Sequence, residues 1–136
     1  MYILGINAYH GDSSACLLKD GQLLAAVEEE RFRRIKHWAG FPSRSIASCL
    51  EAAGISLEQV ACIAVNSDSK ANLFRKILYT LRKKPDPRFL LDRLRNRQQR
   101  GDIHGELERT FPGSRFSGRI IPVEHHLAHL VSAHTI

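Results

Sequence analysis

Three short apolar runs near the start of the chain constrain its fold more than any other feature. They cover residues 2–8, 14–19 and 23–28, and each has the length and the Ile, Leu, Val and Ala content of a strand. Asp20 and Gly21, between the second run and the third, form the dipeptide typical of a tight β-hairpin turn. We therefore predict three consecutive strands in an antiparallel meander.

The next stretch changes to a helical pattern and then returns to a strand. Ser43 is the expected N-cap of a helix that stops at Gly54. Ser56 and Gln59 have the spacing of a small capping box. Residues 60–65 are almost all apolar, which is typical of a buried strand in a parallel sheet.

Residues 68–111 are predicted to be a basic helical insert, divided by Pro85 and Pro87 and ending in a short helix over 102–109. A last strand is expected over 119–123, followed by another helix. The order β-β-β-α-β-α-β-α predicts an α/β fold with a mixed five-stranded sheet. An actin-like or ribonuclease H-like half-domain begins in this way.

The composition is that of one domain with an ordinary core. The chain has 136 residues and no apolar run of the roughly 18 to 20 residues that a membrane helix needs. Its first residues lack the basic region of a signal peptide, so we expect a cytoplasmic location. Cys16, Cys49 and Cys62 lie among apolar neighbours and are interpreted as small core residues.

The formal charge of +6 is concentrated in the expected insert. Residues 68–100 contain eleven Lys or Arg against three Asp, so the remainder of the chain is slightly acidic. Leucine and isoleucine are interleaved with the basic residues, which favours amphipathic helices with a solvated basic face. The alternative is a non-catalytic module that binds nucleic acid or another polyanion.

The polar residues between the first two strands form a candidate phosphate-binding turn. Gly11 would let the backbone approach an anion closely, and the hydroxyls of Ser13 and Ser14 could donate hydrogen bonds to it. His10 could donate a proton or a hydrogen bond to a phosphate oxygen. An ordinary turn stabilised by Asp12 would use the same residue types, so both interpretations remain open.

A second charged segment follows the third strand. Residues 28–30 are three consecutive carboxylates, and four cations follow before Trp38. One interpretation is a charged loop that serves solubility. The other is that Lys36 and His37 neutralise a phosphate group bound at the neighbouring turn.

Four of the seven histidines lie within residues 123–134. His125 and His129 are four residues apart, so on a helix both imidazoles could reach one metal ion. Two imidazoles leave a metal short of ligands, and a buried or solvated histidine-rich helix start is the alternative. His126 and His134 lie off the face that this pair would share.

Three strings, taken together, resemble the N-terminal signature of the O-carbamoyltransferase family. They are residues 3–15 (ILGINAYHGDSSA), 27–37 (VEEERFRRIKH) and 123–129 (VEHHLAH). The family includes nodulation-factor, cephamycin and aminoglycoside carbamoyltransferases. The resemblance implies an enzyme that makes a carbamoyl-adenylate from carbamoyl phosphate and ATP, and then carbamoylates a hydroxyl of a small molecule.

The resemblance also implies roles for individual residues. His125 and His129 match the family's metal-binding pair, which would hold a divalent metal, iron being the first expectation. His10 and Lys36 match residues that act on carbamoyl phosphate, with a catalytic role. The rest of the turn is expected to bind the phosphate groups of the substrates: Gly11, Asp12, Ser13 and Ser14.

Members of that family are several times longer than this chain. We therefore expect residues 1–136 to be the incomplete N-terminal part of the catalytic domain, similar to the tRNA threonylcarbamoyl-transferring proteins. The remainder of that domain, a C-terminal domain and a third metal ligand would be needed as partners. The chain alone is not expected to turn over substrate, and neither a membrane nor a nucleic acid is an expected partner.

Overall fold

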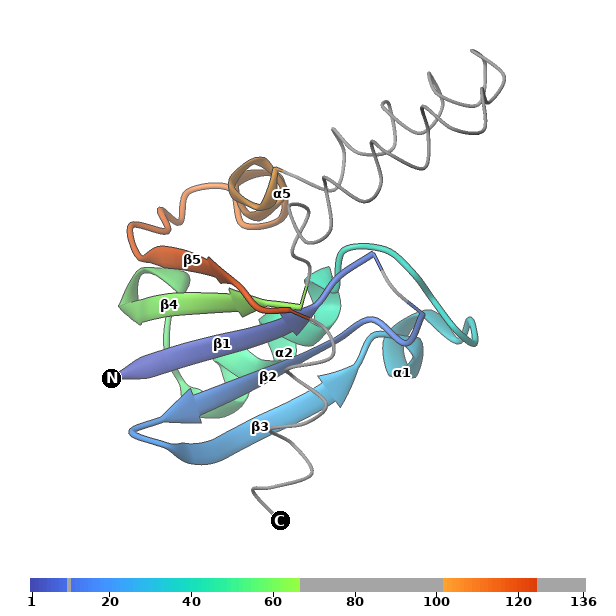
Figure 1. The fold of residues 1–136 in the computed structure, drawn as a ribbon, viewed down its shortest axis with the longest axis horizontal. Helices are drawn as coiled ribbons and strands as arrows, with labels where there is room; N and C mark the ends of the chain where they lie inside the picture. Colours follow the sequence, from blue (N-terminus) through green and yellow to red (C-terminus); the bar gives the residue numbers. More distant parts are fainter. Residues whose placement is uncertain (10, 67–101, 125–136) are drawn as a thin grey trace, which may run out of the picture. The chain divides into compact units, whose positions relative to one another are not determined.

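The computed structural model describes residues 1–9, 11–66 and 102–124 (Figure 1). Of these, residues 1–9, 11–66 and 104–124 belong to one compact unit. His10, His125, His129 and the basic helices predicted over 68–101 lie outside the described residues, so these assignments remain predictions.

The first three strands form the predicted meander. They are β1 (Tyr2–Asn7), β2 (Ser14–Lys19) and β3 (Gln22–Glu28), each antiparallel to the one before. Asp20 and Gly21 both have positive φ, 51° and 85°, as a two-residue turn that follows the twist of a hairpin requires. The Asp-Gly signal therefore identified the hairpin correctly.

Two parallel strands extend the sheet on the other side of β1. The strand β4 (Val60–Val65) pairs in parallel with β1, and β5 (Arg119–Pro122) pairs in parallel with β4. The resulting order is β3-β2-β1-β4-β5 (Figure 1). The predicted α/β fold with a mixed five-stranded sheet is confirmed.

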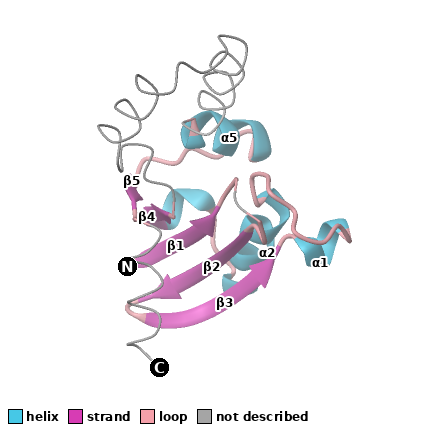
Figure 2. Ribbon diagram, turned by 45° about the vertical axis from the view of Figure 1, so that its right-hand side comes forward, coloured by secondary structure: helices cyan, strands magenta, loops and turns pink. Residues whose placement is uncertain are grey.

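Helix α2 (Ser43–Ala53) packs on β2 and β3 and ends, as predicted, at Gly54, whose φ is 62° (Figure 2). The predicted N-cap was wrong by one residue. Pro42 is the N-cap and Ser43 the first helical residue, with no side-chain hydrogen bond from the cap. The helix does not need one, because a carboxylate far earlier in the chain accepts bonds from its first turn, as described below.

Three further short elements complete the described chain. A one-turn helix, α1 (Glu30–Arg33), directly follows β3 and was not predicted. The 3-10 helix η1 (Leu57–Gln59) carries the capping box predicted between Ser56 and Gln59. Helix α5 (Ile103–Thr110) lies within one residue of its predicted bounds.

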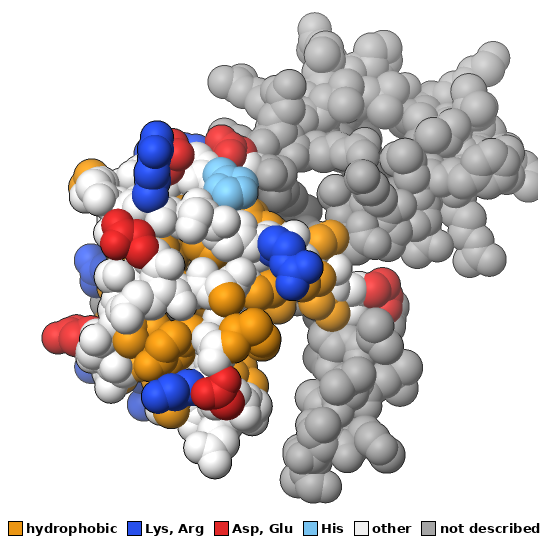
Figure 3. Space-filling view, turned by 90° about the vertical axis from the view of Figure 1, so that its left-hand side faces the viewer, with side chains coloured by type: hydrophobic (Ala, Val, Ile, Leu, Met, Phe, Trp, Pro, Cys, Tyr) orange, Lys and Arg blue, Asp and Glu red, His pale blue; other side chains and the backbone are white. Residues whose placement is uncertain are grey.

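The core lies between the sheet and α2. Leu4, Leu17 and Ile63 are neighbours across β1, β2 and β4 and are fully buried, as is Ile46 of α2. The edge strand β3 is less covered, and its Leu23 is 64% exposed. Figure 3 shows apolar side chains gathered on one face of the described part, among scattered charged ones.

The cysteines are confirmed as core residues. Cys49 and Cys62 are buried, Cys16 is partly buried, and all three are free thiols. Burial, together with the nearby Cys16 thiol, raises the pKa of Cys49 to about 11, so that it stays a thiol at neutral pH. In the described part of the chain no helix is long and apolar enough to cross a bilayer.

Two leucines on the adjacent strands β2 and β3 differ in burial, which predicts different responses to the same substitution. Leu17→Ala leaves a cavity under α2 and should lower the free energy of unfolding by about 3 kcal/mol. Leu23→Ala, on the exposed edge strand, should change it by less than about 0.5 kcal/mol. Urea unfolding of both variants measures this, and equal losses would contradict the described core.

Candidate functional site

The candidate site lies where the parallel strands end. β1, β4 and β5 run in parallel, so their carboxyl ends meet at one edge of the sheet. The pairing continues one residue past β5, because the Val123 N–H donates to the Val65 carbonyl at 2.7 Å. In open α/β sheets ligands bind outside this edge. The turn after β1 and residues 123–124 therefore leave the sheet where a ligand site is expected.

Two asparagines hold the turn after β1. The Asn7 Nδ2 group donates to the Asp12 carbonyl at 2.9 Å and to the Gly11 carbonyl at 3.3 Å. Its Oδ1 accepts a hydrogen bond from Nδ2 of Asn66, which directly follows β4. Neither residue was predicted from the sequence. The available signal in the sequence was that an Asn lies near the end of the first apolar run and another Asn directly follows residues 60–65. Asn commonly bonds to the backbone of a following turn.

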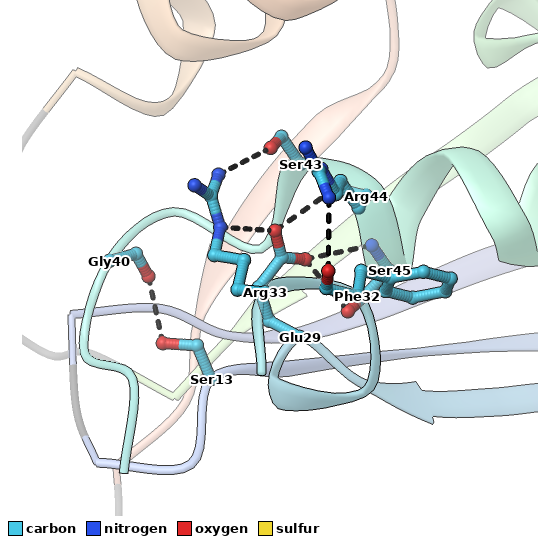
Figure 4. A network of polar contacts seen from close by, with 8 residues as sticks. All are labelled: Ser13, Glu29, Phe32, Arg33, Gly40, Ser43, Arg44 and Ser45. Atoms are coloured by element: carbon cyan, nitrogen blue, oxygen red, sulfur yellow. Dashed lines mark hydrogen bonds and ion pairs between the residues drawn. The ribbon is translucent and has the colours of Figure 1, made fainter. Parts of the chain in front are cut away.

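A second loop, residues 37–41, braces the same turn from its other side (Figure 4). The Tyr9 N–H donates to the Gly40 carbonyl at 3.1 Å, and the Ser13 N–H donates to the Trp38 carbonyl at 3.0 Å. The Ser13 hydroxyl donates to Gly40 at 2.8 Å, and Ser13 is only 1% exposed. The one hydroxyl proton of Ser13 is therefore used inside the protein, and its predicted contact with phosphate remains a prediction.

The other predicted site residues differ in exposure. Gly11, Asp12 and Lys36 are exposed, whereas Ser14 is partly buried as the first residue of β2. Among the described residues Lys36 has no hydrogen bond or ion pair, so its ammonium group is available to a ligand. Lys36 directly precedes the 37–41 loop, which packs against the candidate phosphate turn.

Asp12 and His37 connect the two loops directly. The Asp12 Oδ1 atom and the His37 Nδ1 atom are 2.9 Å apart, and both side chains are largely in solvent. His37 was expected to neutralise a phosphate group, whereas Asp12 was expected to lie in the phosphate turn. The structure shows that their side chains contact each other.

Behind the loops lies a buried carboxylate that the sequence analysis did not single out. Glu29 is fully buried at the junction of β3, α1 and α2 (Figure 4). Its Oε2 accepts hydrogen bonds from the N–H and the hydroxyl of Ser45, both at 2.9 Å. Its Oε1 accepts from Arg33 Nε at 2.8 Å and from the Arg44 N–H at 3.4 Å. Glu29 thereby satisfies first-turn donors of α2 in place of a local cap.

These donors keep Glu29 ionised. Burial alone would raise its pKa, because a carboxylate loses solvation in the interior. The hydrogen bonds from Ser45, Arg33 and Arg44 outweigh that effect, and the pKa of Glu29 lies below its ordinary value. The available signal in the sequence was the four-residue spacing of Glu29 and Arg33, which suits an ion pair on a helix.

Arg33 connects Glu29 to the 37–41 loop. Its guanidinium carbon lies 4.3 Å from the centre of the Trp38 ring, and its NH2 group donates to the Ser43 hydroxyl at 3.3 Å. The Trp38 ring in turn lies against Gly40, where an added Cβ would come within 2.9 Å of ring atoms. The charged segment is therefore an ordered support for Lys36 and His37 as well as a charged surface.

The lowered pKa of Glu29 predicts a pH-dependent stability. Its stabilising effect should be complete above about pH 4.5, its ordinary value, and should disappear as the pH falls through the lower pKa of the folded state. Glu29→Gln should lower the free energy of unfolding at pH 7 by about 2 kcal/mol and flatten this acid dependence. Glu28→Gln, its exposed neighbour, is the matched control, and identical unfolding curves for the two variants would contradict the network.

Comparisons with known proteins identify the family of the chain. The family model "Carbamoyltransferase N-terminus" matches residues 2–136. An uncharacterised protein of Synechocystis, sll1178, is 59% identical over 59 residues, which make up 43% of this chain and 10% of that protein. The nodulation protein NolNO of Sinorhizobium fredii is 53% identical over 58 residues, 43% of this chain and 8% of that protein.

The chain is thus matched to only a small share of these relatives' length. Among solved structures, YeaZ from Pseudomonas aeruginosa superimposes with a TM-score of 0.46 and 12% identity, over 90% of this chain and 43% of that one. The family model spans nearly every residue, including all three strings that carry the resemblance. The chain therefore belongs to the carbamoyltransferase N-terminus family.

Proposed function

We propose that this chain supplies the carbamoyl phosphate part of the active site of an O-carbamoyltransferase. With the rest of the catalytic domain, the enzyme would form a carbamoyl-adenylate from carbamoyl phosphate and ATP, and pass the carbamoyl group to a hydroxyl of a small molecule in the cytoplasm. One observation carries the proposal. The turn after β1 is braced against the loop that presents Lys36, at the carboxyl ends of parallel strands.

The fold assignment behind this proposal is an actin-like or ribonuclease H-like half-domain. It is supported by the strand order β3-β2-β1-β4-β5, with three antiparallel strands followed by two parallel ones. Helix α2 makes the crossover between β3 and β4, as such a half requires. A nucleotide would then lie between this half and a second one.

Within the site, Lys36 has the clearest proposed role. Its exposed ammonium group would bind a phosphate oxygen and offset negative charge as the carbamoyl and phosphate groups separate. The exposed backbone at Gly11 would lie close to the same anion. His10 keeps the catalytic role that the resemblance assigns to it.

The proposed metal rests on the sequence. Among the described residues no group of three or more His, Cys, Asp or Glu could hold a metal ion. His125 and His129, one residue and five residues beyond Glu124, would hold a divalent metal, iron first, with further ligands from elsewhere. A metal bound there would supply a Lewis acid for phosphate oxygens.

The role of Lys36 predicts a specific loss of substrate binding. In the natural protein that carries this chain, Lys36→Gln removes one charge-assisted contact and should weaken carbamoyl phosphate binding roughly 10- to 100-fold. Lys19→Gln, which alters an exposed lysine over the Tyr2 ring, is the control and should bind as the wild type does. Calorimetric titration measures both. Equal affinity of the two variants would exclude the site, and salt-sensitive RNA binding instead would favour a polyanion-binding module.

The histidine pair predicts the metal content. Replacing His125 and His129 together by Ala should remove most of the bound divalent metal, because both proposed imidazole ligands are lost. His104→Ala, an exposed histidine of α5, should leave the metal content unchanged. Elemental analysis of the purified proteins gives the result. Unaltered metal in the double variant would show that the pair is not the metal site.

A further inference from the structure

The contact between Asp12 and His37 has the geometry of an oriented imidazole. Asp12 Oδ1 lies 2.9 Å from His37 Nδ1, although the two residues are 25 apart in sequence. The His37 side chain is 80% exposed and that of Asp12 is 55% exposed, so neither is fixed by burial. Apart from this contact, no described residue bonds to His37, which leaves its Nε2 atom open to a ligand.

The backbone around this contact is unusual. Tyr9, Asp12 and His37 have φ of 61°, 63° and 55°, a region that residues with a side chain rarely adopt. The only other such residues in the described part are Asp20, in the hairpin turn, and Arg34, the C-cap of α1. His37 lies in the turn of residues 36–37, and Asp and His are among the residue types that adopt this conformation most often. Asp12 and His37 make the contact themselves, and Tyr9 lies on the same turn as Asp12.

The charges around the contact fit an anion. Lys36 and Arg34 lie on the same loop as His37, and both are exposed. From the turn, the only described charged side chain is Asp12, which is engaged by His37. A carboxylate has no proton to donate and repels phosphate, so Asp12 suits a phosphate site only when it acts through a neighbour.

We propose that His37 is a substrate-binding residue that donates from Nε2 to a phosphate oxygen, and that Asp12 is the positioning residue that holds its ring. This inference rests on the proposed function and adds a residue to the same site. It also changes the expected role of Asp12, from a contact with the phosphate to a contact with the imidazole.

The chemistry makes the contact depend on pH. When Nδ1–H donates to Asp12, a neutral imidazole has no proton on Nε2, whereas an imidazolium carries one. Only the imidazolium can donate to a phosphate oxygen from Nε2. Protonation of the ring therefore strengthens the contact, and the affinity for an anion should fall as the pH rises.

The test uses the natural protein that carries this chain and two probes, carbamoyl phosphate and sulfate. Sulfate keeps the same charge across the range, so its pH dependence reports the protein alone. Calorimetry between pH 5.5 and 8.5 should find the wild-type affinity highest at low pH. His37→Gln should bind about tenfold more weakly at pH 5.5 and lose most of the pH dependence.

Variants of Asp12 separate orientation from charge. Asp12→Asn keeps an acceptor for Nδ1–H and should retain more affinity than Asp12→Ala, which releases the ring. His104→Gln and Glu51→Gln make the same chemical changes at exposed positions of α5 and α2, and should leave both affinity and pH dependence as in the wild type. Urea unfolding of every variant accompanies the titrations, so that a loss of affinity is attributed to the site only where the fold is retained.

The outcomes distinguish this inference from the proposed function. If Lys36→Gln weakens binding while His37→Gln keeps wild-type affinity and pH dependence, the site stands and the role of His37 is wrong. If the wild type binds neither probe, the proposed function fails and the inference fails with it. If His37→Gln and Asp12→Ala lose the same affinity and the same pH dependence, the pair acts as proposed.

Discussion

The candidate site depends on one buried carboxylate. Glu29 lies where β3, α1 and α2 meet, and a charged group is stable in such a place only because several donors compensate for its lost solvation. It fixes the start of α2 through Ser45 and the position of Arg33 through an ion pair. Without this carboxylate, the first turn of α2 and the Arg33 guanidinium would lack their common acceptor, and the loop that carries Lys36 would lose its support.

The charges of this segment therefore divide into two groups with different roles. Glu29 and Arg33 are used within the protein, one fully buried and the other stacked on Trp38. Lys36 and His37 are exposed and are available to a ligand. The loops themselves are joined by bonds from the backbone and the Ser13 hydroxyl to Gly40 and Trp38, and by the contact between Asp12 and His37. Among these cations of the described chain, Lys36 is consequently the one that is not used for holding the fold together.

The sequence predicted local features well and long-range ones poorly. The bounds of β4 and the Asp20-Gly21 turn follow from hydrophobic runs and turn chemistry, both of which act over a few residues. The N-cap of α2 was wrong because its first-turn donors are satisfied by Glu29, which no local pattern indicates. Lys36 was predicted as a site residue through a motif, whereas the pairing of Asp12 with His37 depends on two loops packing together.

The bonds of Ser13 to the 37–41 loop have a mechanical consequence. A displacement of the turn after β1 would act first on Gly40 and Trp38, which the turn contacts. Trp38 contacts Arg33, and Arg33 is bonded to Glu29, which contacts the start of α2. Turn, loop and helix are thus joined by one continuous series of hydrogen bonds and a ring contact. A substitution at any one of these residues is therefore expected to disturb the position of the next.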